Sequence, residues 1–363
     1  MPVSSGTRLE ILNYVVTMTL GGKNMTVIVD TGSDLTWVQC EPCNACYNQL
    51  EPIFNPSTSL SFKSISCNSS ACRWLQDQAT GNSGACAYSP STCNYYVSYG
   101  DGSYTHGELA MERLDLGKLI HVDNFMFGCG RSNKGLFGST SGLMGLGKSN
   151  LSLVYQTFHQ FGGVFSYCLP SIDAGESGTL TLGGNSSAYR NTTPISYTKM
   201  VQNPQLQSFY MLNLTGIGVG GVQLEAPSFG QNTVLIDSGT VITRLPPSIY
   251  RVLKAEFAKH FSGYPTAPAF SILDTCFNLS SYKQVNLPTV KLHFEGNAEL
   301  NIDVNGVFYY VKSDASQACL AFASLRYEDE IAIIGNYQQK NIRVVYDSKL
   351  SLVGFAQEKC SFL

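Results

Sequence analysis

The sequence is poor in charge and has no long apolar run. Its 363 residues include 13% charged side chains, half of the usual ~25%, and the net charge is −3. No basic block is present, so we expect no surface that follows a nucleic-acid phosphate backbone. No run reaches the ~18 apolar residues that a membrane-spanning helix needs, so we expect no membrane span.

The sequence also lacks the motifs of two large hydrolase classes. Its five histidines form no i, i+4 pair and no H-E-x-x-H, and no G-x-S-x-G occurs. Two phosphate-binding patterns do occur, G-x-x-x-x-G-K-S at 142–149 and G-x-G-x-x-G at 216–221. Neither lies in a βαβ context, so we interpret the first as part of an internal repeat and the second as a β-turn.

What the chain does contain is typical of a mainly β protein. Short β-branched runs recur, separated by Gly, Asn, Ser and Pro, and the length allows two domains with buried cores. The clearest helix is predicted over 248–261, with Ser248 as the N-cap and an apolar stripe that packs on a core.

One stretch of the sequence occurs twice, at 26–33 and at 233–240. Each copy is an apolar run that delivers an aspartate, Asp30 or Asp237, into a turn of hydroxyl, glycine and hydroxyl. A strand-like segment precedes each copy and a matched glycine segment follows it, in the same order. The chain therefore predicts a duplicated β domain, with an N-terminal lobe over 1–186, a C-terminal lobe over 187–363 and a join near 184–195.

Two aspartates presented alike predict a shared catalytic site. If the two turns face each other, the carboxylates share one proton, because two close negative charges repel. One carboxylate then removes a proton from a water while the other donates to a scissile carbonyl. Gly32 and Gly239 allow close backbone approach, and the hydroxyls at 33 and 240 orient the carboxylates. The alternative for either motif alone is an Asx-turn that caps a strand.

Cysteine usage indicates an oxidising compartment. The twelve cysteines fit about six disulfides, and seven of them fall in an insertion over 40–93 that the second half lacks. Cys40, Cys43 and Cys46, with Cys67 or Cys72, have the alternative spacing of a zinc site. Seven N-x-[ST] sequons favour the secretory pathway, at Asn24, Asn68, Asn150, Asn185, Asn191, Asn213 and Asn278. The opening residues lack a signal peptide, so we expect a signal and a pro-segment to have been removed.

Five motifs together carry a family resemblance. They are Asp30-Thr31-Gly32-Ser33, Asp237-Ser238-Gly239-Thr240, Tyr99-Gly100-Asp101-Gly102-Ser103, Phe127-Gly128-Cys129-Gly130 and Ile333-Ile334-Gly335-Asn336. With these motifs and its cysteine-rich insertion, the sequence resembles the pepsin-like aspartic peptidases, and more closely their plant nepenthesin-like branch. The resemblance covers nearly the whole chain.

The resemblance implies a bilobal pepsin-like fold of two β-barrel-like lobes with a few short helices. Asp30 and Asp237 would form the dyad, Thr31 and Ser238 would bond reciprocally across the lobes, and Ser33 and Thr240 would bond the outer carboxylate oxygens. The stretch 99–103 would form a flap hairpin, with Tyr99 bonded to Trp37. Contacts to an extended peptide would come from Gly32, Tyr99, Gly100, Asp101, Gly239 and Thr240.

The same resemblance implies a disulfide scheme that spacing alone does not select. It pairs Cys40–Cys43, Cys46–Cys129, Cys67–Cys93, Cys72–Cys86, Cys168–Cys360 and Cys276–Cys319. One departure from the Asp-Thr-Gly pattern is Ser238, which keeps the hydroxyl but loses a methyl group and β-branched stiffness.

The predicted function is a monomeric aspartic endopeptidase that is most active at acidic pH, needs no metal or cofactor, and is sensitive to pepstatin-type inhibitors. We expect it outside the cell in the apoplast or in the vacuole, with the plastid as an alternative. The competing function is a binding or inhibitor protein on the same scaffold, since a fold does not determine a function. A glycosidase also uses two carboxylates, but these need not lie in twin turns related by duplication.

Overall fold

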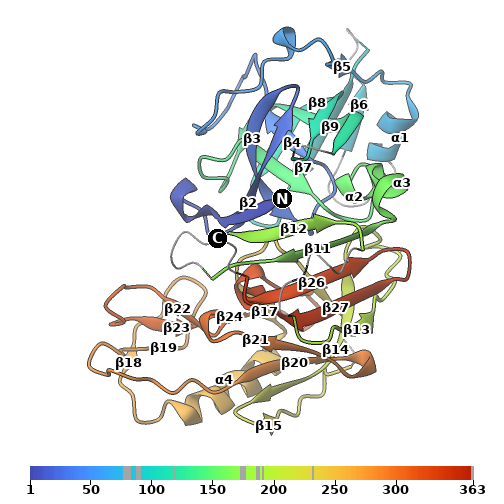
Figure 1. Ribbon diagram of the computed structural model, residues 1–363. Coiled ribbons are helices and arrows are strands. Elements are labelled where there is room, and N and C mark those ends of the chain that lie inside the picture. Colours follow the sequence, from blue (N-terminus) through green and yellow to red (C-terminus); the bar gives the residue numbers. More distant parts are fainter. Residues whose placement is uncertain are drawn as a thin grey trace. The chain divides into compact units, whose positions relative to one another are not determined.

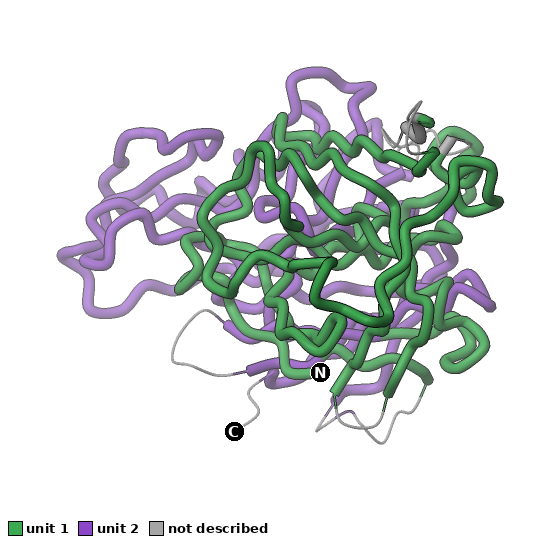
Figure 2. The backbone as a smooth tube through the Cα atoms, turned by 90° about the horizontal axis from the view of Figure 1, so that it is seen from above, with its two compact units in different colours: residues 1–165, 180–184, 202–209 green, residues 166–179, 185–201, 210–363 purple. Residues whose placement is uncertain are grey.

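The computed structural model describes residues 1–76, 83–86, 91–117, 120–171, 177–184, 189, 192–230 and 233–360 (Figure 1). The protein is mainly β with a few short helices, as predicted. It divides into two compact units, coloured separately in Figure 2. Unit 1 comprises Met1–Phe165, Leu180–Gly184 and Gln202–Phe209, and unit 2 comprises Ser166–Thr179, Asn185–Val201 and Tyr210–Leu363.

Unit 1 is built on a sheet in the strand order β1-β2-β3-β10-β4-β9-β8-β7-β6. Its strands are β1 (Pro2–Ser5), β2 (Tyr14–Leu20), β3 (Lys23–Asp30), β4 (Trp37–Gln39), β5 (Lys63–Ser64), β6 (Ser83–Cys86), β7 (Cys93–Ser98), β8 (Tyr104–Asp115), β9 (His121–Lys134) and β10 (Gly142–Gly145). Its helices are α1 (Ser70–Gln76), α2 (Leu153–Gln156) and α3 (Phe158–Phe161).

The strand that ends at Asp30 is buried on both faces. β3 pairs antiparallel with β2 and parallel with β10, and its Val27, Ile28 and Val29 are at most 3% exposed. A continuous apolar run, rather than an alternating one, suits a strand that is covered on both sides. β10 also pairs antiparallel with β4, and β4 runs parallel to β9.

Unit 2 contains most of the remaining elements. Its strands are β13 (Ser196–Lys199), β14 (Met211–Val219), β15 (Val222–Gln223), β16 (Thr233–Ile236), β17 (Thr243–Leu245), β18 (Thr266–Ala267), β19 (Cys276–Phe277), β20 (Val290–Phe294), β21 (Ala298–Ile302), β22 (Phe308–Tyr310), β23 (Ala318–Leu320), β24 (Phe322–Ser324), β25 (Ala332–Ile334), β26 (Ile342–Asp347) and β27 (Leu352–Gln357). Among its described residues, the α-helix is α4 (Pro247–His260), and short 3-10 helices span Glu295–Asn297, Val304–Gly306 and Asn336–Gln339. The unit boundaries fall within β11 (Val164–Cys168) and β12 (Gly178–Leu182).

Unit 2 repeats the strand pairing of unit 1 around its own aspartate. β16 pairs antiparallel with β14 and parallel with β25, while β25 pairs antiparallel with β17 and β17 runs parallel to β24. These pairs correspond to β3 with β2, β3 with β10, β10 with β4 and β4 with β9. The segment 142–149 begins with β10, so its interpretation as part of a repeat is confirmed.

The division into units differs from a single cut at residue 186. The 180–184 segment belongs to unit 1, where the Leu180 amide donates to the Met1 carbonyl at 2.8 Å. The 202–209 segment also belongs to unit 1, in which the Lys148 amide donates to the Ser208 carbonyl at 3.0 Å. The 166–179 segment belongs to unit 2. A disulfide between Cys168 and Cys360 joins this segment to the rest of that unit.

Helix α4 confirms the predicted helix but corrects its cap. It begins at Pro247 and its N-cap is Pro246, so Ser248 lies inside the helix. Proline at the first helical position fits because its missing N–H has no partner there in any case. The amide and hydroxyl of Ser248 donate instead to Glu328, at 2.7 and 2.8 Å.

The glycine-rich stretch 216–221 contains the predicted β-turn, at Gly220 and Gly221, whereas residues 216–219 belong to β14. The turn lies at the end of β14, which pairs antiparallel with β15. Gly220 and Gly221 have φ values of 57° and 87°, which favour glycine. No described helix is long and apolar enough to cross a membrane.

Four disulfide pairings implied by the resemblance are wrong. The structure contains Cys40–Cys129, Cys43–Cys46, Cys67–Cys86 and Cys72–Cys93 in place of Cys40–Cys43, Cys46–Cys129, Cys67–Cys93 and Cys72–Cys86. The pairings Cys168–Cys360 and Cys276–Cys319 are confirmed. Among the described residues no cysteine is free, which leaves no thiolate for the zinc alternative.

Strand register explains the first of these corrections. Cys40 follows β4, which runs beside β9, and its amide donates to the Gly130 carbonyl at 2.9 Å. The Cα atoms of Cys40 and Cys129 therefore lie 5.3 Å apart, and Cys43 and Cys46 share one turn with a Cα separation of 6.0 Å. Both distances suit a disulfide.

The pairings around α1 follow from helix packing and proximity. Cys72 lies in α1 with its Cα atom 5.7 Å from that of Cys93 at the start of β7, and the Cα atoms of Cys67 and Cys86 are 5.4 Å apart. The sulfur atoms of Cys67, Cys72 and Cys86 lie within 4.8 Å of one another. In so small a cluster, sequence spacing cannot select the partners.

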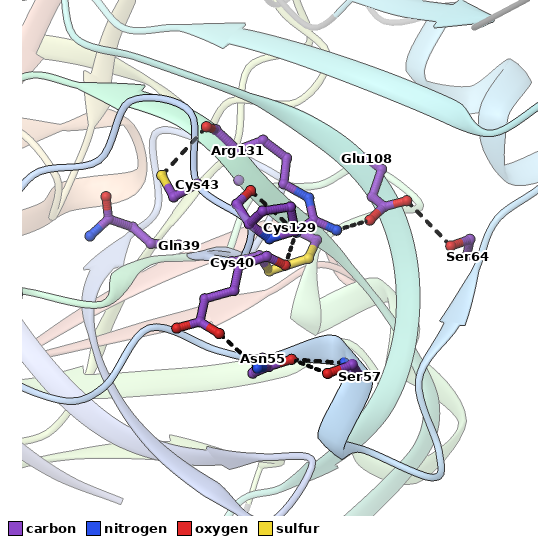
Figure 3. The surroundings of a disulfide bond; sticks show 12 residues. Gln39, Cys40, Cys43, Asn55, Ser57, Ser64, Glu108, Cys129 and Arg131 are labelled. Carbon is purple, nitrogen blue, oxygen red and sulfur yellow. Dashed lines mark hydrogen bonds and ion pairs between the residues drawn. A yellow bond between two sulfur atoms is a disulfide. The ribbon is translucent and has the colours of Figure 1, made fainter. Parts of the chain in front are cut away.

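An arginine fixes the start of the cysteine-rich insertion to the sheet. Figure 3 shows Arg131 of β9 beside the Cys40–Cys129 disulfide, where its guanidinium pairs with Glu108 and donates to the Glu41 carbonyl. The Glu41 carboxylate accepts from the Asn55 amide side chain at 2.7 Å. The insertion is therefore anchored by polar contacts as well as by its disulfides.

Candidate active site

The first aspartate turn holds a buried carboxylate in a fixed orientation. Asp30 is the last residue of β3, lies opposite Gly145 of β10 and is 4% exposed. Its Oδ1 accepts from the Gly32 amide at 2.9 Å, and its Oδ2 accepts from the Ser33 hydroxyl at 2.5 Å. The glycine and hydroxyl of the motif therefore bond one carboxylate oxygen each.

The second aspartate turn has the same geometry. Asp237 follows β16 and is 7% exposed, and its amide donates to the Ile334 carbonyl at 3.0 Å. Its Oδ1 accepts from the Gly239 amide at 2.7 Å, and its Oδ2 accepts from the Thr240 hydroxyl at 2.6 Å. Each unit thus presents one aspartate through the same pair of hydrogen bonds.

The residues next to the aspartates are buried as well. Thr31 and Ser238 are both fully buried, while Gly32 and Gly239 are half-buried. The reciprocal bond between Thr31 and Ser238 that the resemblance implies remains a prediction.

Sequence reasoning missed a second matched pair of threonines. Thr36 and Thr243 each lie six residues after an aspartate and are fully buried. The Thr36 hydroxyl accepts from the Gly145 amide at 3.1 Å, and the Thr243 hydroxyl accepts from the Gly335 amide at 3.0 Å. Each bond ties an aspartate turn to the parallel strand beside it. The signal was present in the sequence, because aligning the two repeats places a threonine at this position in both.

The segment that matches a phosphate-binding pattern holds the first turn instead. Beyond β10, the Leu146 amide donates to the Asp30 carbonyl at 2.8 Å, and the Gly147 amide donates to the Ser33 carbonyl at 2.9 Å. These backbone donors are engaged by the protein's own carbonyls, which argues against a phosphate cradle. In unit 2 the Asn336 amide makes a related bond to the Thr240 carbonyl at 2.7 Å.

The predicted flap is the hairpin between β7 and β8. The Tyr99 amide donates to the Ser103 carbonyl at 2.9 Å, and the Gly102 amide donates to the Tyr99 carbonyl at 3.0 Å. Asp101 closes the turn, since its carboxylate accepts from the Ser103 amide and from the Ser103 hydroxyl, both at 2.8 Å. Gly100 and Asp101 are exposed at the tip, and their contact with a peptide remains a prediction.

The contact between Tyr99 and Trp37 is confirmed. The Trp37 indole N–H donates to the Tyr99 hydroxyl at 2.7 Å. Burial and the nearby charge of Asp30 raise the pKa of Tyr99 well above its usual value, so its phenol stays neutral. The Phe137 ring, which no motif revealed, packs edge-on against both aromatic rings, with centroids 5.0 Å from Trp37 and 5.8 Å from Tyr99.

Comparison with known families matches both halves of the chain. The family model described as xylanase inhibitor N-terminal matches residues 14–184, and the one described as xylanase inhibitor C-terminal matches residues 209–357. Among solved structures, basic 7S globulin from soybean has a TM-score of 0.76 and is 21% identical, covering 99% of this chain and 97% of that one. At this identity the structural match supports the fold alone.

Curated relatives are more similar to this chain in sequence than the soybean globulin is. An aspartyl protease family protein of Arabidopsis thaliana is 45% identical over 99% of this chain and 75% of the relative. Aspartic proteinase nepenthesin-1 of Nepenthes gracilis is 33% identical over 96% of this chain and 78% of the relative. With both halves matched and relatives at this identity along nearly its whole length, the chain belongs to the pepsin-like aspartyl protease family.

Proposed function

We propose that the protein is an aspartic endopeptidase in which Asp30 and Asp237 activate one water between them. The observation that carries this proposal is the pair of buried aspartates, one in each unit, whose oxygens accept the same two hydrogen bonds. The naming of relatives as aspartyl proteases supports the same reaction class.

The chemistry follows from bringing the two carboxylates together. Such a pair keeps one shared proton, because two adjacent negative charges repel. The ionised carboxylate removes a proton from the water as it attacks the peptide carbonyl, and the protonated one donates to the carbonyl oxygen. Because the reaction needs that shared proton, we expect the highest activity at acidic pH.

The surrounding residues take supporting roles in this proposal. Ser33 and Thr240 hold the outer carboxylate oxygens, and Thr31 and Ser238 bond each other's turn. The flap residue Tyr99 lies over the bound peptide, whose backbone is contacted by Gly32, Gly100, Asp101, Gly239 and Thr240. No metal or cofactor takes part, and the enzyme acts as a monomer on protein or peptide substrates.

Protein digestion at acidic pH tests the proposal. Casein or haemoglobin should be cleaved near pH 3–5, and pepstatin should stop the cleavage. Asp30→Asn and Asp237→Asn should each abolish turnover without unfolding the chain, whereas the exposed Asp329→Asn should leave turnover unchanged. A correctly folded protein without pepstatin-sensitive cleavage across this range would falsify the proposal.

A binding function on the same scaffold is the second candidate, because both family models carry the name of xylanase inhibitors. An inhibitor would lower the activity of an endoxylanase, and the two aspartate variants would inhibit as well as the wild type. Against this candidate, the aspartates, the hydroxyls that follow them and the flap tyrosine are all present. Inhibition without proteolysis would favour it.

We also propose that the protein acts in the apoplast or the vacuole. Six disulfides are typical of proteins that fold in the secretory pathway. A fluorescent fusion of the full-length gene product should enter that pathway, and accumulation in plastids would support the alternative.

A further inference from the structure

A second acid lies directly behind the first aspartate turn. Asp34 is four residues after Asp30 and is only 2% exposed. A buried carboxyl group costs free energy unless hydrogen bonds or an opposite charge compensate for it. The proposed dyad chemistry does not use this group.

The hydrogen bonding of Asp34 is unequal at its two oxygens. Oδ1 accepts from the Ser149 amide at 3.0 Å, whereas Oδ2 has no hydrogen-bond partner among the described residues. The hydroxyls of Ser149 and Ser208 lie beside the carboxyl group. A serine hydroxyl can accept from a protonated carboxyl group or donate to an ionised one, so these neighbours offset only part of the cost of burying a charge at this position.

Asp34 contacts the segment that holds the first turn in place. Within residues 146–149, the Leu146 and Gly147 amides bond the Asp30 and Ser33 carbonyls, and the Ser149 amide bonds the Asp34 side chain. The packing is close, since a Cβ atom on Gly147 would lie 2.3 Å from Asp34 Oδ1. A change in the charge of Asp34 therefore acts directly on the backbone that orients Asp30.

Lys148 is a charged group that acts on Asp34. Burial raises the pKa of Asp34 to about 6. The Ser149 amide, the neighbouring Ser149 and Ser208 hydroxyls and the charge of Lys148 lower it again only in part. Burial also lowers the pKa of Lys148. Asp34 thus stays protonated in acid and loses its proton as the pH approaches neutrality.

Unit 2 performs the same task with neutral side chains. The position equivalent to Asp34 is Val241, four residues after Asp237. There the Gln339 side chain donates to the Asp237 carbonyl at 3.2 Å, and the Gln338 side chain accepts from the Thr243 amide at 3.1 Å. The two aspartate turns therefore differ here, because only the first is held through an ionisable group at this position.

We propose that Asp34 is a positioning residue for Asp30. The neutral carboxylic acid of Asp34 joins the first turn to residues 146–149, and ionisation of Asp34 loosens that segment. The structural part of this inference concerns unit 1 and does not depend on catalysis. Its consequence for turnover rests on the proposed peptidase function.

Stability as a function of pH tests the structural part. Because the folded-state pKa of Asp34 lies above the unfolded value of 3.8, its contribution to stability is present in acid and is lost between about pH 4 and 6. Between about pH 4 and 6, the equilibrium constant for unfolding of the wild type should rise. The side chain in Asp34→Asn is neutral at every pH, so the rise in that variant should be smaller by a factor of up to roughly 100. The matched control is Asp123→Asn, an exposed acid in the same unit, which should follow the wild type.

Two further measurements separate positioning from general stability. Hydrogen exchange at the Leu146, Gly147 and Ser149 amides, corrected for intrinsic rates, should lose protection near pH 6 in the wild type and keep it in Asp34→Asn. Lys148→Met removes the charge that lowers the pKa of Asp34, so the transition should move to higher pH. If peptidase activity is found, the neutral-pH decline of kcat/KM should shift upward in Asp34→Asn.

Equal pH dependence of stability and of amide protection in the wild type and Asp34→Asn would overturn the inference. That result would leave the peptidase proposal intact, because Asp30 and Asp237 are untouched. Conversely, an inactive protein whose 146–149 amides still respond to Asp34 would overturn the peptidase proposal alone.

Discussion

Single hydroxyl groups carry much of the geometry of each aspartate turn. Ser33 and Thr240 hold the carboxylates, while Thr36 and Thr243 hold the turns to β10 and β25. The first pair was predicted from the motif itself. The second pair lies outside any motif, and its role emerged only from the parallel pairing of strands that are distant in the sequence.

Replacing either threonine by valine should loosen its turn. Thr36→Val or Thr243→Val keeps the shape but leaves a buried glycine amide without an acceptor, which costs about 1–3 kcal/mol. Thr243→Val should cost more, since its hydroxyl also donates to Gln338 Oε1 at 2.6 Å. Denaturant unfolding and kcat should both show the loss.

The serine variants are the controls for this prediction. Thr36→Ser and Thr243→Ser keep the hydroxyl and lose one methyl group, about 0.8 kcal/mol if it is fully buried. Equal losses for the valine and serine variants would show that the hydrogen bond contributes nothing.

At the scale of elements, the sequence predicted the strands and turns that depend on neighbouring residues. The apolar runs 26–29 and 233–236 predicted the two strands, and the hydroxyl-glycine-hydroxyl turns predicted the aspartate geometry. The flap and its contact with Trp37 were predicted through the resemblance. Burial of Asp34 was not predictable, because its neighbours Ser149 and Ser208 come from segments more than a hundred residues away.

Disulfide pairing illustrates the limit most clearly. Cys40 pairs with Cys129 because β4 and β9 run side by side, and no local pattern specifies that register. Around α1, sulfur atoms within 4.8 Å of one another leave partner choice to small differences in packing.

Counting thiols distinguishes the two disulfide schemes. Replacing both Cys43 and Cys46 by serine removes one complete disulfide in the structure, so the variant should contain no free thiol. Under the scheme implied by the resemblance, the same variant would leave Cys40 and Cys129 unpaired. Two reactive thiols per unfolded, unreduced chain would therefore contradict the structure.

At the scale of the whole molecule, buried tyrosine side chains limit the stability of the fold at alkaline pH. Burial raises the pKa values of Tyr47, Tyr95 and Tyr99 in unit 1 and of Tyr250 in unit 2. Because these folded-state values lie above the unfolded one near ~10, the phenols contribute stability that is lost as the pH rises beyond it. The fold should therefore weaken steeply above about pH 10.

Parallel absorbance and circular dichroism measurements check this prediction. Phenolate absorbance from these tyrosines should appear only together with the loss of the near-ultraviolet dichroism signal. The exposed Tyr327 provides the internal contrast, since its phenol is open to solvent. Complete titration of all tyrosines in a protein that keeps its dichroism would rule the prediction out.

Under the proposed peptidase function, the Cys168–Cys360 disulfide has a consequence for the lifetime of the protein. It joins β11 to a residue near the C-terminus across 192 positions, so most of unit 2 lies within one covalent loop. A peptidase of the proposed kind would meet other copies of itself as substrates. A single cut anywhere between residues 169 and 359 would leave the two pieces linked through sulfur, so neither would diffuse away and a nicked molecule could still function.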